Sequence, residues 1–161
     1  MSRITYALFA GAAIGLSAVV TATLGCFPAT ASPGSGASGT VVAQGTTGDQ
    51  VHVQSTGATR MVYQRVTIQP NGFTGWHTHP GPLLVVVESG TLTHYDRHCN
   101  VATYHAGDAF EETPGANAVH MGANYGAEPV VLDVTYILPA DAPLRDEADA
   151  PACASDGLAR S

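Results

Sequence analysis

The sequence is poor in charged residues, above all in basic ones, and in cysteine. Charged residues make up 12% of the 161 residues, and 6 basic residues stand against 13 acidic ones, so the formal net charge is −7. Proteins that bind nucleic acid present a basic face, so this balance argues against nucleic acid as a partner. The 3 cysteines show no C-x-x-C spacing, which argues against a zinc site built from cysteine.

Three catalytic patterns are also missing: a nucleophile elbow, a phosphate-binding loop and a pair of catalytic carboxylates. No long helical periodicity follows residue 40. Instead, 18 glycines and 10 prolines separate short apolar or alternating segments, which is typical of many short strands joined by turns. A chain of this length has room for one modest domain with a single core, so we expect one all-β domain.

The first 31 residues have the pattern of an export signal. Arg3 precedes an uncharged apolar run from Ile4 to Val20, and Ala29-Thr30-Ala31 fits the small-residue rule for cleavage before Ser32. A transmembrane anchor is the alternative, but the missing positive flank argues against it, and we expect no membrane span in the mature chain. Thr23 to Cys26 also fits a permissive lipoprotein box, so lipid anchoring at Cys26 is a further alternative.

These signals divide the chain into four segments. Residues 1–31 are the expected signal peptide, and residues 32–39 are a flexible linker rich in small residues. Residues 40–138 are the expected β-barrel. Residues 139–161 form a C-terminal tail in which alanine, aspartate and proline dominate, so we expect it to be mostly irregular.

Cysteine parity fits export. With Cys26 removed or lipidated, Cys99 and Cys153 remain, and an oxidising compartment favours their pairing. The bridge would tether the tail to the loop after Tyr95 and stabilise the domain by about 4 kcal/mol on the chain-entropy model. Two free thiols are the alternative.

The hydrophobic pattern predicts nine strands. The segment 83–87 (Leu-Leu-Val-Val-Val) is apolar on both faces, as a central buried strand should be. The expected strands span residues 40–44, 50–54, 60–69, 83–87, 91–95, 100–104, 109–113, 118–121 and 129–138. A closed or jelly-roll double sheet would protect its edges and leave an internal cavity.

The most informative motif is His77-Thr78-His79, followed later in the chain by His120. Two histidines one residue apart on an extended segment point to the same face, because side chains alternate with period two. Two imidazoles on one face can bind a divalent metal, and a third from a neighbouring strand would complete a facial set. We therefore expect a metal site at His77, His79 and His120.

The order of these residues resembles the two motifs of the cupin family. The first motif has H-x-H, a glutamate and then a glycine, matched here by His77, His79 and Gly90; in the second, histidine and asparagine match His120 and Asn124. The resemblance covers roughly residues 40 to 138. It implies a small double-stranded β-helix, or cupin barrel, of the jelly-roll type.

One departure from the family pattern concerns the acidic ligand. The family spacing, counted back from Gly90, puts Leu83 at the position of the glutamate, so Leu83 should form an apolar wall beside the metal site. A three-histidine site follows, unless Glu111 or Glu112 supplies a carboxylate from the strand that approaches His120. The alternative role for these two glutamates is a solvated or turn-capping one.

The other histidines and the single tryptophan are expected to have no ligand role. His94, His98 and His105 lie in or beside polar connections, which favours surface imidazoles, and His52 should face solvent or the rim. Trp76 precedes the first histidine, points to the opposite face and should pack in the core.

The resemblance implies a metal-binding protein with a small-molecule ligand or substrate. Iron, zinc, manganese or copper could occupy a three-histidine site, whose open positions would permit dioxygenase, lyase or isomerase chemistry. An exported protein would have difficulty keeping iron ferrous, which argues against oxygenation. A non-enzymatic cupin that binds a small ligand or a metal is the alternative, and a homodimer is one assembly open to it.

Overall fold

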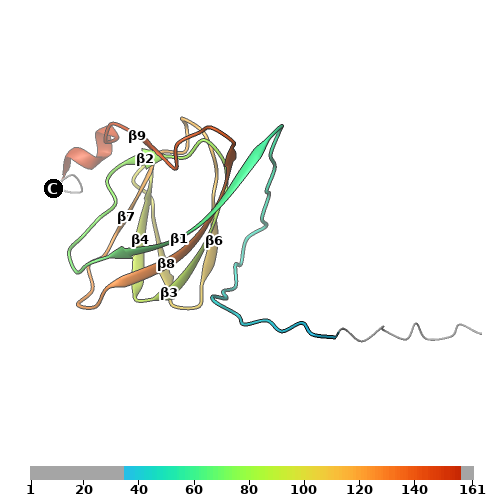
Figure 1. Cartoon of the computed structure of the whole chain (residues 1–161). Coiled ribbons are helices and arrows are strands. Elements are labelled where there is room, and N and C mark those ends of the chain that lie inside the picture. The colour runs from blue at the N-terminus through green and yellow to red at the C-terminus, as the bar shows by residue number, and fades with distance from the viewer. Residues whose placement is uncertain (1–34, 157–161) are drawn as a thin grey trace, which may run out of the picture. The chain divides into compact units, whose positions relative to one another are not determined.

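The structure is a computed structural model that describes residues 35–156 (Figure 1). The expected signal peptide, the candidate lipid-anchor residue Cys26 and the start of the linker lie outside these residues. The fold described below belongs to the unit that begins at Gly39. Within residues 35–156, no helix has the length and apolar character needed to cross a membrane.

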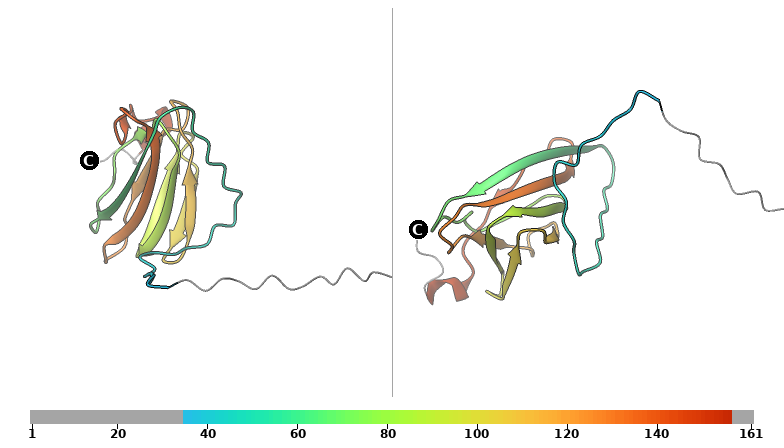
Figure 2. Two further views of the ribbon diagram at one scale, coloured as in Figure 1. Left: turned by 45° about the vertical axis from the view of Figure 1, so that its right-hand side comes forward. Right: turned by 90° about the horizontal axis from the view of Figure 1, so that it is seen from below.

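Two antiparallel sheets face each other, which confirms the expected all-β double-stranded β-helix (Figures 1 and 2). In the first sheet the strand order is β1-β8-β3-β6, and in the second it is β5-β4-β7-β2-β9. The strands of the first sheet are β1 (Thr59–Ile68), β3 (Leu83–Ser89), β6 (Ala109–Glu112) and β8 (Val130–Pro139). Those of the second are β2 (His77–Thr78), β4 (Thr91–Asp96), β5 (Val101–His105), β7 (His120–Ala123) and β9 (Asp146–Glu147).

The main core lies against the inner face of the first sheet. Strand β3 pairs with β8 on one side and with β6 on the other, so it is the central buried strand that its apolar sequence predicts. The buried side chains of this core include Leu83, Val85, Leu92, Leu132 and Val134. A smaller cluster contains Trp76, Tyr95, Met121 and Ala154, and the burial of Trp76 confirms its expected packing role.

Two of the expected strands do not form. Residues 40–44 and 50–54 have no strand structure, and the neighbouring Thr46 makes only an isolated bridge to Asp108. Val41 and Val42 are 71% and 65% exposed, so this segment buries no apolar face that would fix it against a sheet. The local sequence pattern was therefore not enough to predict whether these two segments form strands.

The C-terminal tail is more ordered than expected. Strand β9 pairs with β2, and a short 3₁₀ helix η1 spans Ala152–Asp156. Backbone hydrogen bonding continues from this pairing, because the Ala148 N–H donates to the Trp76 carbonyl at 3.0 Å. The tail thus joins the second sheet next to the H-x-H motif.

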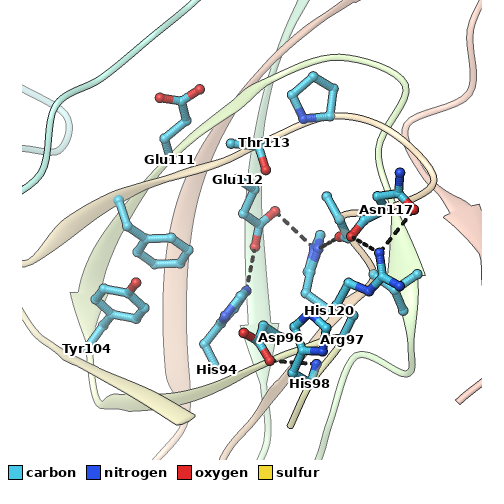
Figure 3. A pocket seen from close by; sticks show the side chains of 14 residues that line it. His94, Asp96, Arg97, His98, Tyr104, Glu111, Glu112, Thr113, Asn117 and His120 are labelled. Atoms are coloured by element: carbon cyan, nitrogen blue, oxygen red, sulfur yellow. Dashed lines mark hydrogen bonds and ion pairs between the residues drawn. The ribbon is translucent and has the colours of Figure 1, made fainter. Parts of the chain in front are cut away.

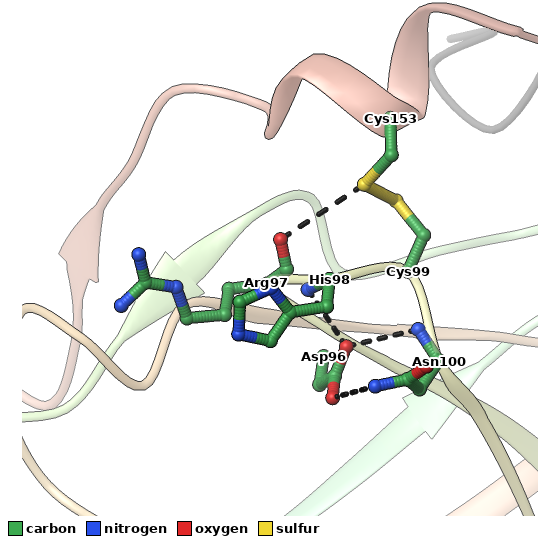
Figure 4. Close-up of a disulfide and its surroundings, with 6 residues drawn as sticks. All are labelled: Asp96, Arg97, His98, Cys99, Asn100 and Cys153. Atoms are coloured by element: carbon green, nitrogen blue, oxygen red, sulfur yellow. Dashed lines mark hydrogen bonds between the residues drawn. A yellow bond between two sulfur atoms is a disulfide. The ribbon is translucent and has the colours of Figure 1, made fainter.

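A disulfide between Cys99 and Cys153 fixes the tail to the loop after β4 (Figure 4). The two Cα atoms lie 6.2 Å apart, within the usual range for a disulfide. In the same loop, the Asp96 carboxylate accepts hydrogen bonds from the backbone N–H groups of His98 and Asn100. The expected bridge is present in the structure, and disulfides are typical of oxidising compartments.

Candidate metal centre

Three imidazoles meet between the two sheets. His77 is the first residue of β2, and His79 is the residue that follows the end of this strand. His120 is the first residue of β7 and the cross-strand partner of His77. The three residues are 6%, 2% and 5% exposed. The three candidate ligand nitrogens lie within 4.8 Å of one another, so the structure brings together the three residues that the sequence singles out.

The loop after His79 passes close to β8. A Cβ atom at Gly81 would lie 2.1 Å from the carbonyl oxygen of Ile137, so any residue with a side chain would push the loop away. This close approach seats the H-x-H segment against the first sheet.

Each histidine uses its Nδ1 atom to bond a backbone carbonyl. His77 Nδ1 lies 2.9 Å from Gly75 O, and His79 Nδ1 lies 2.7 Å from Leu144 O. His120 Nδ1 lies 2.8 Å from Ala118 O. A carbonyl oxygen can only accept, so in neutral imidazoles the proton is on Nδ1 and the Nε2 lone pair is free.

The Nε2 atoms of His79, His94 and His120 are buried and make no aligned hydrogen bond among the described residues. Unpaired buried polar atoms of this kind are rare, because their burial costs free energy. Bare imidazole nitrogens on convergent histidines are what a divalent metal requires, so the residues present fit such an ion.

Glu112 brings to the cluster a carboxylate, which this chain lacks at the family's usual position. Its Oε2 lies 3.2 Å from His79 Nε2 and 3.3 Å from His120 Nε2, and its side chain is 13% exposed. Glu112 is the register partner of Leu83, so it projects from the strand beside the position where the family motif has its glutamate. Leu83, 1% exposed, lines the cavity with His77 and His79, as expected.

Glu111, the neighbour of Glu112 in β6, takes no part in the histidine cluster. Figure 3 shows Glu111 pointing away from the histidines while Glu112 points toward His94 and His120. The Glu111 Oε2 atom accepts a hydrogen bond from the backbone N–H of His52 at 2.7 Å. Of the two candidate carboxylates, only Glu112 reaches the site.

The expectation that His94 is a surface imidazole is wrong. Its side chain is 16% exposed, its Nε2 lies 3.5 Å from Glu112 Oε1, and its ring stacks on His120 with centroids 5.2 Å apart. His94 lies inside β4, two residues after the buried Leu92, so strand alternation puts both on the inner face. That period-two relation was a usable signal in the sequence. His52, His98 and His105 are exposed, as expected.

The protonation states suit a cation site. Burial lowers the pKa of His77 to about 4, with a further contribution from nearby His120, so His77 is neutral at pH 7. Burial alone would raise the pKa of Glu112, but its contacts with His120, His79 and His94 outweigh burial and hold that pKa well below its usual range. Burial alone would lower the pKa of His120, but its hydrogen bond with Glu112 outweighs burial and raises that pKa, so a metal ion would have to displace a proton there. The site therefore combines a neutral His77 with an ionised carboxylate.

Two hollows meet at Glu112 and His94, which line both. An inner cavity of about 340 Å³ lies between the sheets and includes His77 and His79 in its wall. An outer pocket of about 420 Å³ reaches His120 from the side of Arg97 and Tyr104 (Figure 3). Small molecules thus have room on both sides of the cluster.

Asn124, the last residue of the family's second motif, has a structural role. Its side chain is 1% exposed and donates to the carbonyls of Ile68 and Glu128 at 2.9 and 2.8 Å. Its Oδ1 accepts from the Gly126 N–H at 2.9 Å. Asn124 therefore fixes the connection between β7 and β8 rather than contributing to the histidine cluster.

Comparison with known proteins finds a family model and solved structures that are similar to part of the chain. Residues 64–137, from β1 to β8, match the family model described as Cupin domain. A conserved protein with a double-stranded β-helix domain from Klebsiella pneumoniae is 27% identical, over 55% of this chain and 76% of that one, with a TM-score of 0.46. A cupin domain from Bordetella pertussis is 21% identical, over 55% of this chain and 91% of that one, with a TM-score of 0.44. A polyketide cyclase from Streptomyces resistomycificus is 18% identical, over 62% and 70%, with a TM-score of 0.48. No curated protein matches the chain.

Proposed function

We propose that this protein, whose residues 64–137 match the cupin domain model, binds one divalent metal ion through the Nε2 atoms of His77, His79 and His120. One observation carries the proposal: all three Nδ1 atoms bond backbone carbonyls, so in the neutral imidazoles the proton is on Nδ1 and the three Nε2 atoms are free to bind a metal ion. Backbone acceptors behind ligand histidines are a common means of fixing their tautomer and orientation.

We further propose that Glu112 is the fourth ligand. It is ionised, mostly buried and already within 3.3 Å of two of the ligand nitrogens. Three nitrogens and one carboxylate oxygen suit iron, zinc, manganese or copper, so the donor set leaves the identity of the metal open.

The proposed activity is metal-dependent chemistry on a small molecule held in the inner cavity. A divalent metal with open positions supplies Lewis-acid activation of a bound oxygen group. The chain's own residues position that group: the apolar wall around Leu83 excludes water, and His94, in contact with Glu112, is placed to hold or release a proton at its Nε2 atom. Dioxygenase, lyase and isomerase reactions are the classes compatible with this arrangement.

A non-enzymatic cupin that binds a small ligand or metal is the second candidate. The observation that favours it is the absence, within residues 35–156, of a titratable side chain facing the inner cavity beyond the histidines, Glu112, Tyr136 and Arg145. Arg145 is held by Glu147 and by the Thr74 carbonyl, which leaves it little freedom for chemistry. Turnover of any oxygen-bearing small molecule by the metal-loaded protein would separate the two candidates.

We also propose that the protein is exported, with its first 31 residues removed as a signal peptide or with Cys26 lipidated. The Cys99–Cys153 disulfide supports an oxidising location. Mass spectrometry of the protein recovered from its native host would decide the matter. A mature chain beginning at Ser32 supports simple cleavage, a lipidated Cys26 supports anchoring, and an intact chain starting at Met1 contradicts both.

The metal proposal is tested by titrating zinc into metal-stripped protein. We expect one ion per chain, and a loss of at least 100-fold in affinity when His77 is replaced by alanine, because a ligand is removed. His105→Ala is the matched control, since His105 is an exposed histidine outside the cluster. Equal binding by wild type and His77→Ala would contradict the proposed site.

A further inference from the structure

The inner cavity has a more hydrophobic wall than a site for a small polar substrate needs. Five buried aliphatic side chains from β3, β4 and β8 line it: Leu83, Val85, Leu92, Leu132 and Val134. Leu144 and Val66 add partly buried apolar surface. All seven side chains belong to or pack against the main core, so the cavity is an unfilled part of that core.

The polar side chains of the cavity include the histidines, Glu112, Tyr136 and Arg145. The ring of Tyr136 lies against that of His79, with centroids 5.8 Å apart, and its hydroxyl donates to Gln64 Oε1 at 2.9 Å. Arg145 donates to the Thr74 carbonyl at 2.9 Å. Gln64 is exposed and Arg145 is partly exposed, so the cavity meets the surface beside these two side chains. Most of the remaining wall is aliphatic.

We propose that the ligand is a small, mainly hydrophobic molecule of ring size, with one anionic oxygen-bearing head that binds the metal. Leu83 carries much of this inference, because it puts a branched aliphatic group beside the histidines where the family motif has a carboxylate. A cavity of about 150 Å³ is enough for benzene. The 340 Å³ here therefore has room for a substituted ring together with its head group. The inference rests on the proposed metal site.

The test compares two probes that share a metal-binding head and differ in their apolar body. Benzohydroxamate carries a phenyl ring and acetohydroxamate a methyl group. Binding of each to zinc-loaded protein is measured by calorimetry, after correction for its affinity for free zinc. We expect benzohydroxamate to bind at least about 10-fold more tightly, because the phenyl ring is removed from water by the aliphatic wall.

Two variants locate the effect. Val134→Thr keeps the shape of the side chain but adds a hydroxyl to the wall, and Val66→Phe fills part of the cavity from the edge strand β1. Each should weaken benzohydroxamate binding about 3- to 10-fold and leave acetohydroxamate binding unchanged. Val131→Thr is the matched control, because Val131 is on the opposite face of β8 from Val134 and does not line the cavity.

The outcomes separate the two proposals. If zinc binds and the two probes bind equally, or neither binds, the hydrophobic-ligand inference is overturned while the metal site stands. A protein that binds no zinc overturns the metal site and this inference with it. If the phenyl preference persists unchanged in both cavity variants, the ring binds elsewhere and the inference is also overturned.

Discussion

Replacing Glu112 by glutamine tests whether the Glu112 carboxylate is the fourth metal ligand. The variant keeps the size of the side chain and removes one negative charge next to the histidine nitrogens. A carboxylate and a divalent ion about 4 Å apart interact by about 8 kcal/mol at an effective dielectric constant of 20. The amide oxygen and entering water should recover about three quarters of that stabilisation. We therefore expect a loss of about 2 kcal/mol, or about 30-fold in zinc affinity.

The assay is a competition titration of zinc against a chromophoric chelator at pH 7.5. Glu111→Gln is the matched control, because Glu111 lies on the same strand but bonds the backbone of His52 outside the cluster. The control should bind zinc like the wild type. If Glu112→Gln also binds zinc like the wild type, the carboxylate is not a ligand and the site consists of histidines alone.

A second variant moves the carboxylate instead of deleting it. Leu83 and Glu112 are opposite each other in register and face the same cavity, and Cβ atoms of such pairs are about 4.5–5.5 Å apart. We expect the double variant Leu83→Glu/Glu112→Gln to recover much of the lost affinity, because the carboxylate returns at the family's usual position. Zinc affinity no better than that of Glu112→Gln would show that position 83 does not reach the ion.

Three further predictions concern stability. Asn124→Ala removes three hydrogen bonds from a buried turn, so it should lower the free energy of unfolding by about 3 kcal/mol in urea titrations; a change under about 1 kcal/mol would contradict the role of Asn124. Hydrogen bonds from Arg65 hold the pKa of Asp133 below its usual range, so this pair stabilises the fold above the unfolded-state pKa of Asp133 and ceases to do so as pH falls through the lower folded-state value. Arg65→Ala should therefore lower the melting temperature most near pH 7 and least at pH 2, and a loss independent of pH would refute the coupling. Cys99→Ser opens a disulfide across 54 residues and should cost about 4 kcal/mol in the same urea titrations, whereas no change would indicate that the bridge to Cys153 is absent in the folded protein.

The hydrophobic pattern was sufficient to predict the strands that carry the core. The uninterrupted apolar run from Leu83 predicts the central strand β3, and the long alternating segment near Arg60 predicts β1. The segments at 40–44 and 50–54 have similar local composition but find no sheet partner. Strand β9 consists of two charged residues and forms by pairing with β2. The local sequence therefore could not predict it.

In the site, too, residue spacing along the chain predicted some features, whereas others depend on how distant strands pair. The spacing of His77, His79 and His120 was enough to predict that they converge, because residues two apart on an extended segment share a face. The choice between Glu111 and Glu112 depends on the register of β6 against β3, which no local pattern fixes. His94 was missed because it was grouped with the polar residues that follow it, although it lies in the strand predicted at 91–95 and shares a face with Leu92.

X-ray absorption at the zinc edge of the loaded protein reports directly which atoms bind the metal. We predict a first shell of three imidazole nitrogens at about 2.0–2.1 Å and an oxygen at about 2.0–2.2 Å, with the outer-shell scattering of imidazole rings. In His77→Ala, one imidazole should be lost from that shell. A spectrum dominated by oxygen without imidazole scattering, or one unchanged by His77→Ala, would contradict the three-histidine centre.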